Sequence, residues 1–171
     1  MLVLAIVPAL APAQSGGLER QVKAAYLYKF SGFIEWPEGS FARPDSPLVI
    51  GIAGDDALAE QLERTVAGRS INGRPVQVQR LKKGEPRAPL HILFLGADRA
   101  VAQDMLAQYK GQPVLTVSDR EEVFGMGSVI NFVVAEERLR FEVSLKAAAS
   151  AGLRVSARML AVAYRVQQEG A

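Results

Sequence analysis

The sequence predicts a single α/β domain of three layers, in which helices cover a mostly parallel sheet of about six strands. Apolar segments of strand length alternate with amphipathic segments of helical length as far as residue 117. This alternation is typical of parallel sheets that carry helices on both faces. Two β-rich segments on either side of residues 135–138 add a C-terminal antiparallel hairpin. The length of 171 residues and the apolar content of 49% suit one domain with a real core.

Residues 1–13 have the pattern of a signal peptide. An apolar run from Leu2 to Leu10 is followed by Ala11-Pro-Ala13, an A-x-A cleavage signal, although no Lys or Arg precedes the run. Pro8 argues against a core helix here. The run is also too short to span a bilayer, which takes about 20 apolar residues. We therefore expect export, cleavage after Ala13 and a folded domain over residues 18–168.

The N-terminal part of the domain is expected to alternate between helix and strand. The expected elements are a helix over 18–34, a loop over 38–47, a buried strand over 48–53, a helix over 56–67 and a half-exposed strand over 75–81. Trp36-Pro37 is expected to end the first helix, because the residue before a proline avoids helical geometry. Asp55 or Asp56 can cap the second helix. Asn72-Gly73 predicts a tight turn before the half-exposed strand.

The C-terminal part continues the alternation and then adds the hairpin. The expected elements are buried strands over 90–95 and 114–117 with a helix over 99–109 between them, a loop over 118–126, hairpin strands over 129–134 and 139–143, and helices over 145–151 and 156–167. Gly152 is expected to separate the last two helices. Ser156 is a plausible N-cap for the second of them.

Composition excludes several kinds of chemistry. The chain has no cysteine, which rules out disulfides, thiolate catalysis and Cys-based metal sites. Its one histidine, His91, lacks the partners that a catalytic triad or a His-rich metal site needs. A net charge of +2 gives no general reason to expect binding to nucleic acid or to a membrane surface. We expect no cofactor, no metal site and no catalytic residues.

Acidic residues follow three of the predicted strands, at the edge where ligands of open α/β sheets bind. They are Asp55 and Asp56, Asp98, and Asp119. Such a cluster could hold Mg²⁺, but helix capping explains Asp55 or Asp56 and Asp98 fully, and we favour capping. A small-molecule site near Asp55, Ser118 and Asp119 is the alternative to a protein-binding function.

Two surfaces are candidates for contact with a partner. One comprises the aromatic side chains of the first helix and its end, and the other is the 118–127 loop. The candidate partner-binding residues are Tyr26, Tyr28, Phe33, Trp36, Asp119, Phe124 and Met126. The basic stretch over 69–87 is either a docking face for an acidic partner or a charge-protected sheet edge.

Several segments together resemble the YfiR-like family of periplasmic proteins. They are Lys23–Phe30, Phe33–Pro37, Pro113–Asp119, Phe124, Gly127–Phe132, Arg140–Glu142 and Ala151–Leu153, in that order. The resemblance covers about residues 22–163. This chain lacks the disulfides of some members, and Ser128 stands where a second glycine is common in the family.

The resemblance implies a regulatory protein with no enzymatic activity. The best-understood members of the family are periplasmic repressors, and some members dimerise. They bind the periplasmic sensor domain of a membrane-bound diguanylate cyclase and hold its cytoplasmic output off, so their release raises cyclic di-GMP and favours biofilm. We therefore expect an exported inhibitor of a membrane signalling protein, with a homodimer possible. The alternative is a periplasmic small-molecule binding protein.

Overall fold

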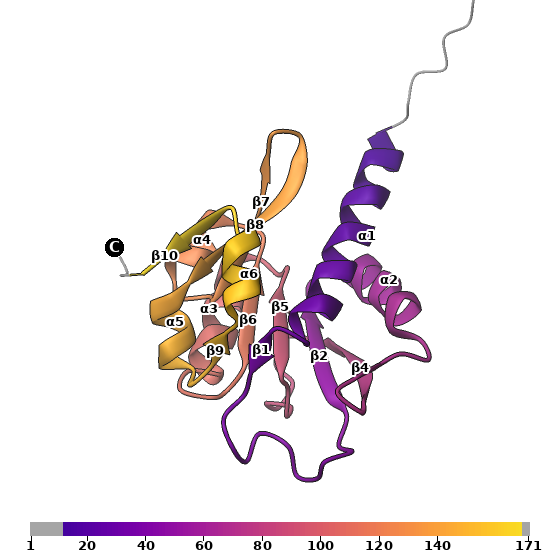
Figure 1. Cartoon of the computed structure of the whole chain (residues 1–171). Helices are drawn as coiled ribbons and strands as arrows, with labels where there is room; N and C mark the ends of the chain where they lie inside the picture. The colour runs from indigo at the N-terminus through magenta and orange to yellow at the C-terminus, as the bar shows by residue number, and fades with distance from the viewer. Residues whose placement is uncertain (1–11, 169–171) are drawn as a thin grey trace, which may run out of the picture.

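A computed structural model describes residues 12–168 of the chain, and an eight-stranded sheet runs through its middle (Figure 1). The sheet has the order β10-β8-β7-β6-β5-β2-β4-β3, and β1 and β9 form a separate antiparallel pair. The strands are β1 Ile34–Glu35, β2 Leu48–Ala53, β3 Ser70–Ile71, β4 Arg74–Leu81, β5 Ile92–Leu95, β6 Leu115–Ser118, β7 Ile130–Ala135, β8 Arg138–Ser144, β9 Arg154–Val155 and β10 Arg165–Gln167. The predicted fold class is confirmed. The sheet exceeds the expected six strands because β3 and β10 also join it.

Six helices flank the sheet in the described part of the chain. They are α1 Pro12–Phe30, α2 Asp56–Val66, α3 Arg99–Gln108, α4 Glu121–Gly125, α5 Leu145–Ser150 and α6 Ala157–Val162. None of the helices over residues 12–168 has the length and apolar character that crossing a membrane requires.

The central strands are parallel and buried along their length. β2 pairs with both β4 and β5, and β5 pairs with β6, all in parallel. Every residue of β5 and β6 is buried. Continuous apolar strands of this kind occur where helices cover both faces of a parallel sheet. The β7–β8 pair is antiparallel, as the hairpin pattern predicted.

Alternate side chains of the central strands enter two separate cores. Ile92 and Phe94 of β5 join a cluster with the buried faces of α1 and α2. Leu93 and Leu95 join a second cluster with α3 on the other face of the sheet. This two-sided packing gives the three layers that the alternation of strands and helices predicted.

The first helix differs from the prediction at both ends. It begins at Pro12, where a proline is well tolerated because the first turn of a helix has no partner for its N–H. The predicted leader lies mostly outside the described residues, and the predicted cleavage point after Ala13 falls in the first turn. The helix ends at Phe30, before Trp36-Pro37, because the chain turns through Ser31–Phe33 and then pairs with β9.

Two further predictions near the C-terminal half are wrong. The 118–126 segment is not wholly a loop, because α4 buries Val123 and Phe124 within it. The helix predicted over 156–167 stops at Val162, and β10 then pairs in parallel with β8. The free edge of β8 gives this segment a hydrogen-bonded partner, which a continued helix would not use.

Candidate partner-binding groove

The β7–β8 hairpin and the N-terminal half of α1 rise together above the carboxyl end of the parallel strands (Figure 1). β6 ends at Ser118, and β7 pairs with it only at Ile130 and Asn131. The rest of β7 pairs with β8 alone in the described structure. The backbone edge of β7 that would continue the β6 pairing is therefore open beyond Asn131.

A groove of about 240 Å³ lies beside this open edge. Its lining residues come from α1, the end of β6, α4 and the hairpin. They are Glu19, Lys23, Asp119, Glu121, Asn131, Phe132, Val133, Val134 and Leu139. We call this feature the hairpin groove. It combines an apolar wall on the hairpin with charged groups on the helix side.

An ion pair joins α1 to the end of β6 in the hairpin groove. The Nζ of Lys23 lies 3.1 Å from the Oδ2 of Asp119 and 3.3 Å from the Oε1 of Glu19. The helical spacing of Glu19 and Lys23 places both on the same face of α1. The Lys23 side chain is only 12% exposed, and its two carboxylate partners compensate the cost of burying an ammonium group.

Buried hydroxyl groups hold the polar end of the groove. The Ser118 Oγ donates to the Oδ1 of Asn131 at 2.9 Å and lies 2.8 Å from the Oγ of Ser128. All three residues are buried. Satisfied buried polar networks fix side-chain positions. Ser128 is thus part of the scaffold behind the groove.

An aromatic cluster supports the hairpin from below. The Phe30 ring lies 5.2 Å from the Phe141 ring in an edge contact and 6.0 Å from the Phe132 ring, centroid to centroid. The Tyr26 ring stacks on Phe30 at 5.7 Å. These contacts fix α1 against β7 and β8, and so they set the width of the groove.

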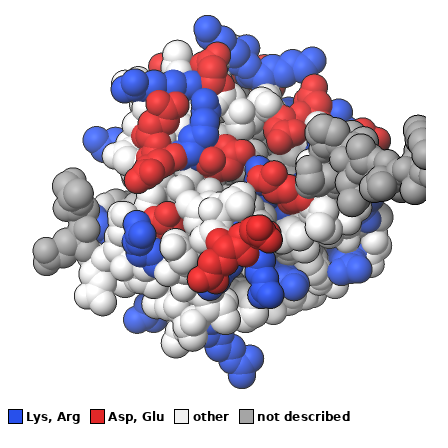
Figure 2. Space-filling view, turned by 90° about the horizontal axis from the view of Figure 1, so that it is seen from above, with Lys and Arg blue, Asp and Glu red and all other residues white. Residues whose placement is uncertain are grey.

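The rim of the groove is apolar and acidic. Val134 is 67% exposed on the hairpin. Glu19, Asp119 and Glu121 supply three carboxylates against the single ammonium group of Lys23. Figure 2 looks down on this end of the molecule and shows acidic side chains around its middle. The groove therefore suits an apolar segment that carries basic groups.

The structure separates the predicted partner-binding residues. Asp119 lines the hairpin groove, and Tyr26 lies beneath it against Phe132. Trp36 lies at the opposite edge of the sheet, where its Nε1 donates to the carbonyl of His91. The remaining four do not line the groove. Tyr28 donates to the Ser70 carbonyl, Phe33 is 37% exposed, Phe124 is buried and Met126 is half-buried.

The sequence did not identify Lys23, Val134 and Leu139 as groove residues. The one available signal was the position of Val134, an apolar residue directly before the predicted turn of the hairpin.

The acidic residues at the strand ends act mainly as structural groups. Asp55 accepts from the Leu58 N–H at 2.9 Å and Asp98 from the Val101 N–H at 3.0 Å, which confirms both as helix N-caps. Among the described residues, no three acidic or histidine side chains gather as a metal site would require. Ser118 is buried in the hydroxyl network, where its Oγ donates to Asn131.

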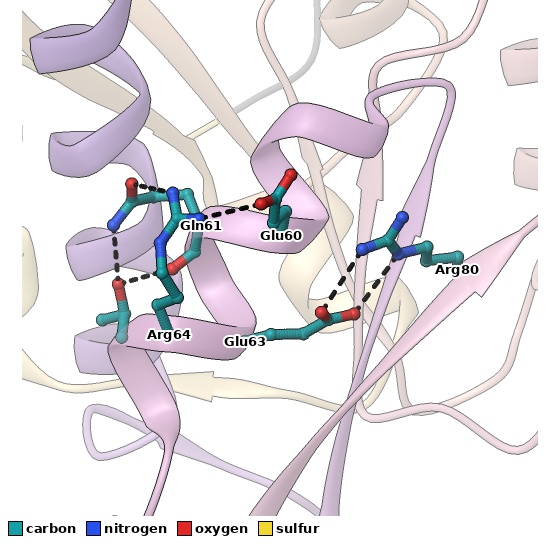
Figure 3. A network of polar contacts seen from close by, with 6 residues as sticks. Glu60, Gln61, Glu63, Arg64 and Arg80 are labelled. Atoms are coloured by element: carbon teal, nitrogen blue, oxygen red, sulfur yellow. Dashed lines mark hydrogen bonds and ion pairs between the residues drawn. The ribbon is translucent and has the colours of Figure 1, made fainter.

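The basic stretch over 69–87 is divided by local pairing. The guanidinium of Arg80 contacts both carboxylate oxygens of Glu63 on α2, each at 3.3 Å (Figure 3). On the same helix, Arg64 pairs with Glu60 at 3.0 Å. Arg74 donates to the carbonyls of Arg43 and Ser46. Arg74 and Arg80 of this stretch are therefore engaged in contacts within the molecule.

Residues 20–164 match the YfiR/HmsC-like family. The chain belongs to this family. Membership implies a periplasmic regulator of diguanylate cyclase signalling, and members of the family are regulators and not enzymes. In this YfiR/HmsC-like chain, the matched region contains both the aromatic cluster and the hairpin groove.

Proposed function

We propose that this chain is exported to the periplasm and inhibits a membrane-bound diguanylate cyclase by binding the periplasmic sensor part of that cyclase. The family match over residues 20–164 carries the proposal. The signal-peptide pattern of residues 1–13 supports export.

The hairpin groove is the proposed contact surface. Its open β7 edge offers backbone donors and acceptors to an added strand, which is a common mode of peptide recognition. Val134 and Leu139 supply apolar contacts, and the surplus of carboxylates attracts a basic segment. The partner segment that fits is therefore extended, apolar on one face and basic at its flank.

Inhibition requires only a difference in affinity between two sensor conformations. A regulator that binds the inactive conformation better shifts the sensor toward it by that difference. A preference of about 3 kcal/mol changes the ratio of the two conformations about 150-fold. Neither covalent chemistry nor a cofactor is needed for this mechanism.

Val134→Arg tests the contact surface. We expect it to weaken binding to the cyclase tenfold or more, equivalent to about 1.4 kcal/mol, because it places a cation against a basic partner and removes an apolar contact. Stability should change by less than about 0.5 kcal/mol, because the site is exposed. Val162→Arg is the matched control, since Val162 is 63% exposed on α6 and does not line the groove.

Pull-down of the cyclase with the purified full-length variants measures this difference. Equal recovery with the Val134 and Val162 variants would remove the groove from the proposal but leave the inhibitory function standing. Failure of the wild-type protein to recover any cyclase would count against the inhibitory function itself.

A further inference from the structure

The loop over residues 37–47 crosses the amino-terminal edge of the sheet, at the opposite end from the hairpin groove (Figure 1). It contains no helix or strand, and its internal hydrogen bonds are short turn contacts, such as Ser40 N–H to the Pro37 carbonyl and Ser46 N–H to the Arg43 carbonyl. The side chains of Arg74 on β4 and of His91, the residue before β5, attach the loop to the sheet. The closed position of the loop therefore depends on a small set of contacts.

The imidazole of His91 forms two of these contacts. Its Nδ1 accepts from the backbone N–H of Val49 at 3.0 Å. Its Nε2 lies 2.9 Å from the Ser40 carbonyl oxygen, which can only accept. The two partners together require the neutral ring with its proton on Nε2. His91 is 9% exposed and is the only histidine in the chain.

The same ring is part of a stack that ends in a cation. Phe41 of the loop lies parallel to His91, with centroids 4.1 Å apart and an interplanar angle of 9°. The Arg74 guanidinium lies 3.6 Å from the Phe41 centroid and also donates to the Arg43 and Ser46 carbonyls. The Trp36 ring meets His91 edge-on at 6.1 Å.

A proton on Nδ1 is incompatible with this arrangement. The new N–H would point at the Val49 N–H, so that two donors would face each other and neither would have an acceptor. The added positive charge would also be separated from the Arg74 guanidinium only by the Phe41 ring, so the two cations would repel each other. Arg87 and Tyr109 line the same cavity, and the loop carries Glu38, Arg43 and Asp45, all exposed.

We propose that His91 is a proton-sensitive latch, whose protonation releases the 37–47 loop from the sheet and opens the cavity beneath it while the rest of the fold stays intact. The cavity has a volume of about 610 Å³ and is walled by Val49, Leu90 and Val114 together with loop residues. Burial lowers the pKa of His91, an effect that the Ser40 hydrogen bond opposes and Arg74 strengthens. The closed loop therefore holds the ring neutral. This device stands on its own geometry and does not depend on the proposed function.

The chain supplies its own two reporters, because it contains one histidine and one tryptophan. The full-length protein is titrated from pH 8 downward, following the imidazole resonance by NMR and the Trp36 emission by fluorescence. The Trp36 indole donates to the His91 carbonyl, so loop release changes its surroundings. We expect both signals to change with one shared midpoint below the ordinary histidine pKa of about 6.5, while far-UV circular dichroism stays constant and the Val49 amide loses its exchange protection.

His91→Gln is the control, because a glutamine can accept from Val49 and donate to Ser40 without titrating. Its Trp36 emission should show no transition over that range. If this variant does not fold, Phe41→Leu is used in its place. Loss of the Phe41 ring leaves the imidazole less buried, so its pKa should rise, and the pH midpoint of the Trp36 fluorescence change should rise with it. Three results would each overturn the latch. They are a Trp36 emission change whose midpoint differs from that of the imidazole titration, an unchanged emission transition in His91→Gln, and a loss of the circular dichroism signal of the helices over the same pH range.

Discussion

At the scale of single residues, Phe30 is central to the position of α1. It is 2% exposed and contacts aromatic rings on both hairpin strands. We expect Phe30→Ala to lower the free energy of unfolding by about 3–5 kcal/mol, because it removes these contacts and leaves a cavity. Urea denaturation measures the change.

Phe33→Ala is the matched control for Phe30→Ala, because Phe33 lies three residues later and is 37% exposed. Its cost should be clearly smaller, since less apolar area leaves the core. Equal losses from the two substitutions would mean that the aromatic cluster does not anchor α1.

His91 should also make stability depend on pH. Burial lowers the pKa of the folded imidazole below its ordinary value of 6.5, so the unfolded chain binds the proton more tightly. The stabilising contribution is therefore complete above pH 6.5 and is lost as pH falls through the lower folded pKa. Urea midpoints at a series of pH values should fall more steeply for the wild type than for His91→Gln. If the urea midpoints of the two proteins fell equally with pH, the expected loss of stability through His91 would be contradicted.

Residue roles could be predicted where the partners are close in sequence. Asp55 and Asp98 cap helices that begin one residue later; the local pattern predicted Asp98 and narrowed the other cap to Asp55 or Asp56. His91 finds its partners 42 and 51 residues away, and Lys23 lies 96 residues from Asp119. No local pattern encodes such contacts, so the sequence indicated only that His91 lacks catalytic or metal-binding partners, and it gave no role to Lys23.

At the scale of elements, the turns after β2 and β5 come into close contact. Gly54 has φ +74°, and a Cβ built on it would lie 2.3 Å from the Cα of Ala97. Gly54→Ala must therefore move one of the two turns. Gly68 has a similar φ of +69° at the end of α2, with open space where its Cβ would lie.

The variants Gly54→Ala and Gly68→Ala together distinguish backbone strain from steric conflict. We expect Gly68→Ala to cost about 1 kcal/mol, the usual penalty for a side chain in the left-handed region. Gly54→Ala should cost distinctly more, because backbone displacement adds to the same strain. Thermal unfolding of both variants provides the comparison, and equal costs would show that the turns separate freely.

The bounds of the buried strands, α2 and α3 were predictable, whereas those of α1 and of the shortest elements were not. The buried strands and α2 and α3 show clear apolar patterns, and the structure places them within one or two residues of their predicted bounds. β9 has two residues and β10 has three, which is too short for a periodic pattern. α4 is a five-residue helix without a side-chain cap. These segments take their conformation from tertiary partners.

At the scale of the whole molecule, the two ends of the sheet differ in character. The carboxyl end carries the hairpin groove with its open strand edge and surplus of carboxylates. The amino-terminal edge carries the loop held by His91. The fold class was predictable from the order of elements, but the groove was not, because it forms where three distant segments meet. We propose that the carboxyl end contacts the cyclase.

The cellular concentration of cyclic di-GMP tests the proposed inhibition most directly. It is measured in cells that lack this chain and in cells that regain it either complete or without residues 1–13. We predict that the concentration rises on deletion, returns to its original level with the complete chain and stays high with the leaderless form, which remains in the cytoplasm. A concentration that is unchanged on deletion, or that the leaderless form restores, would contradict a periplasmic inhibitor of a diguanylate cyclase.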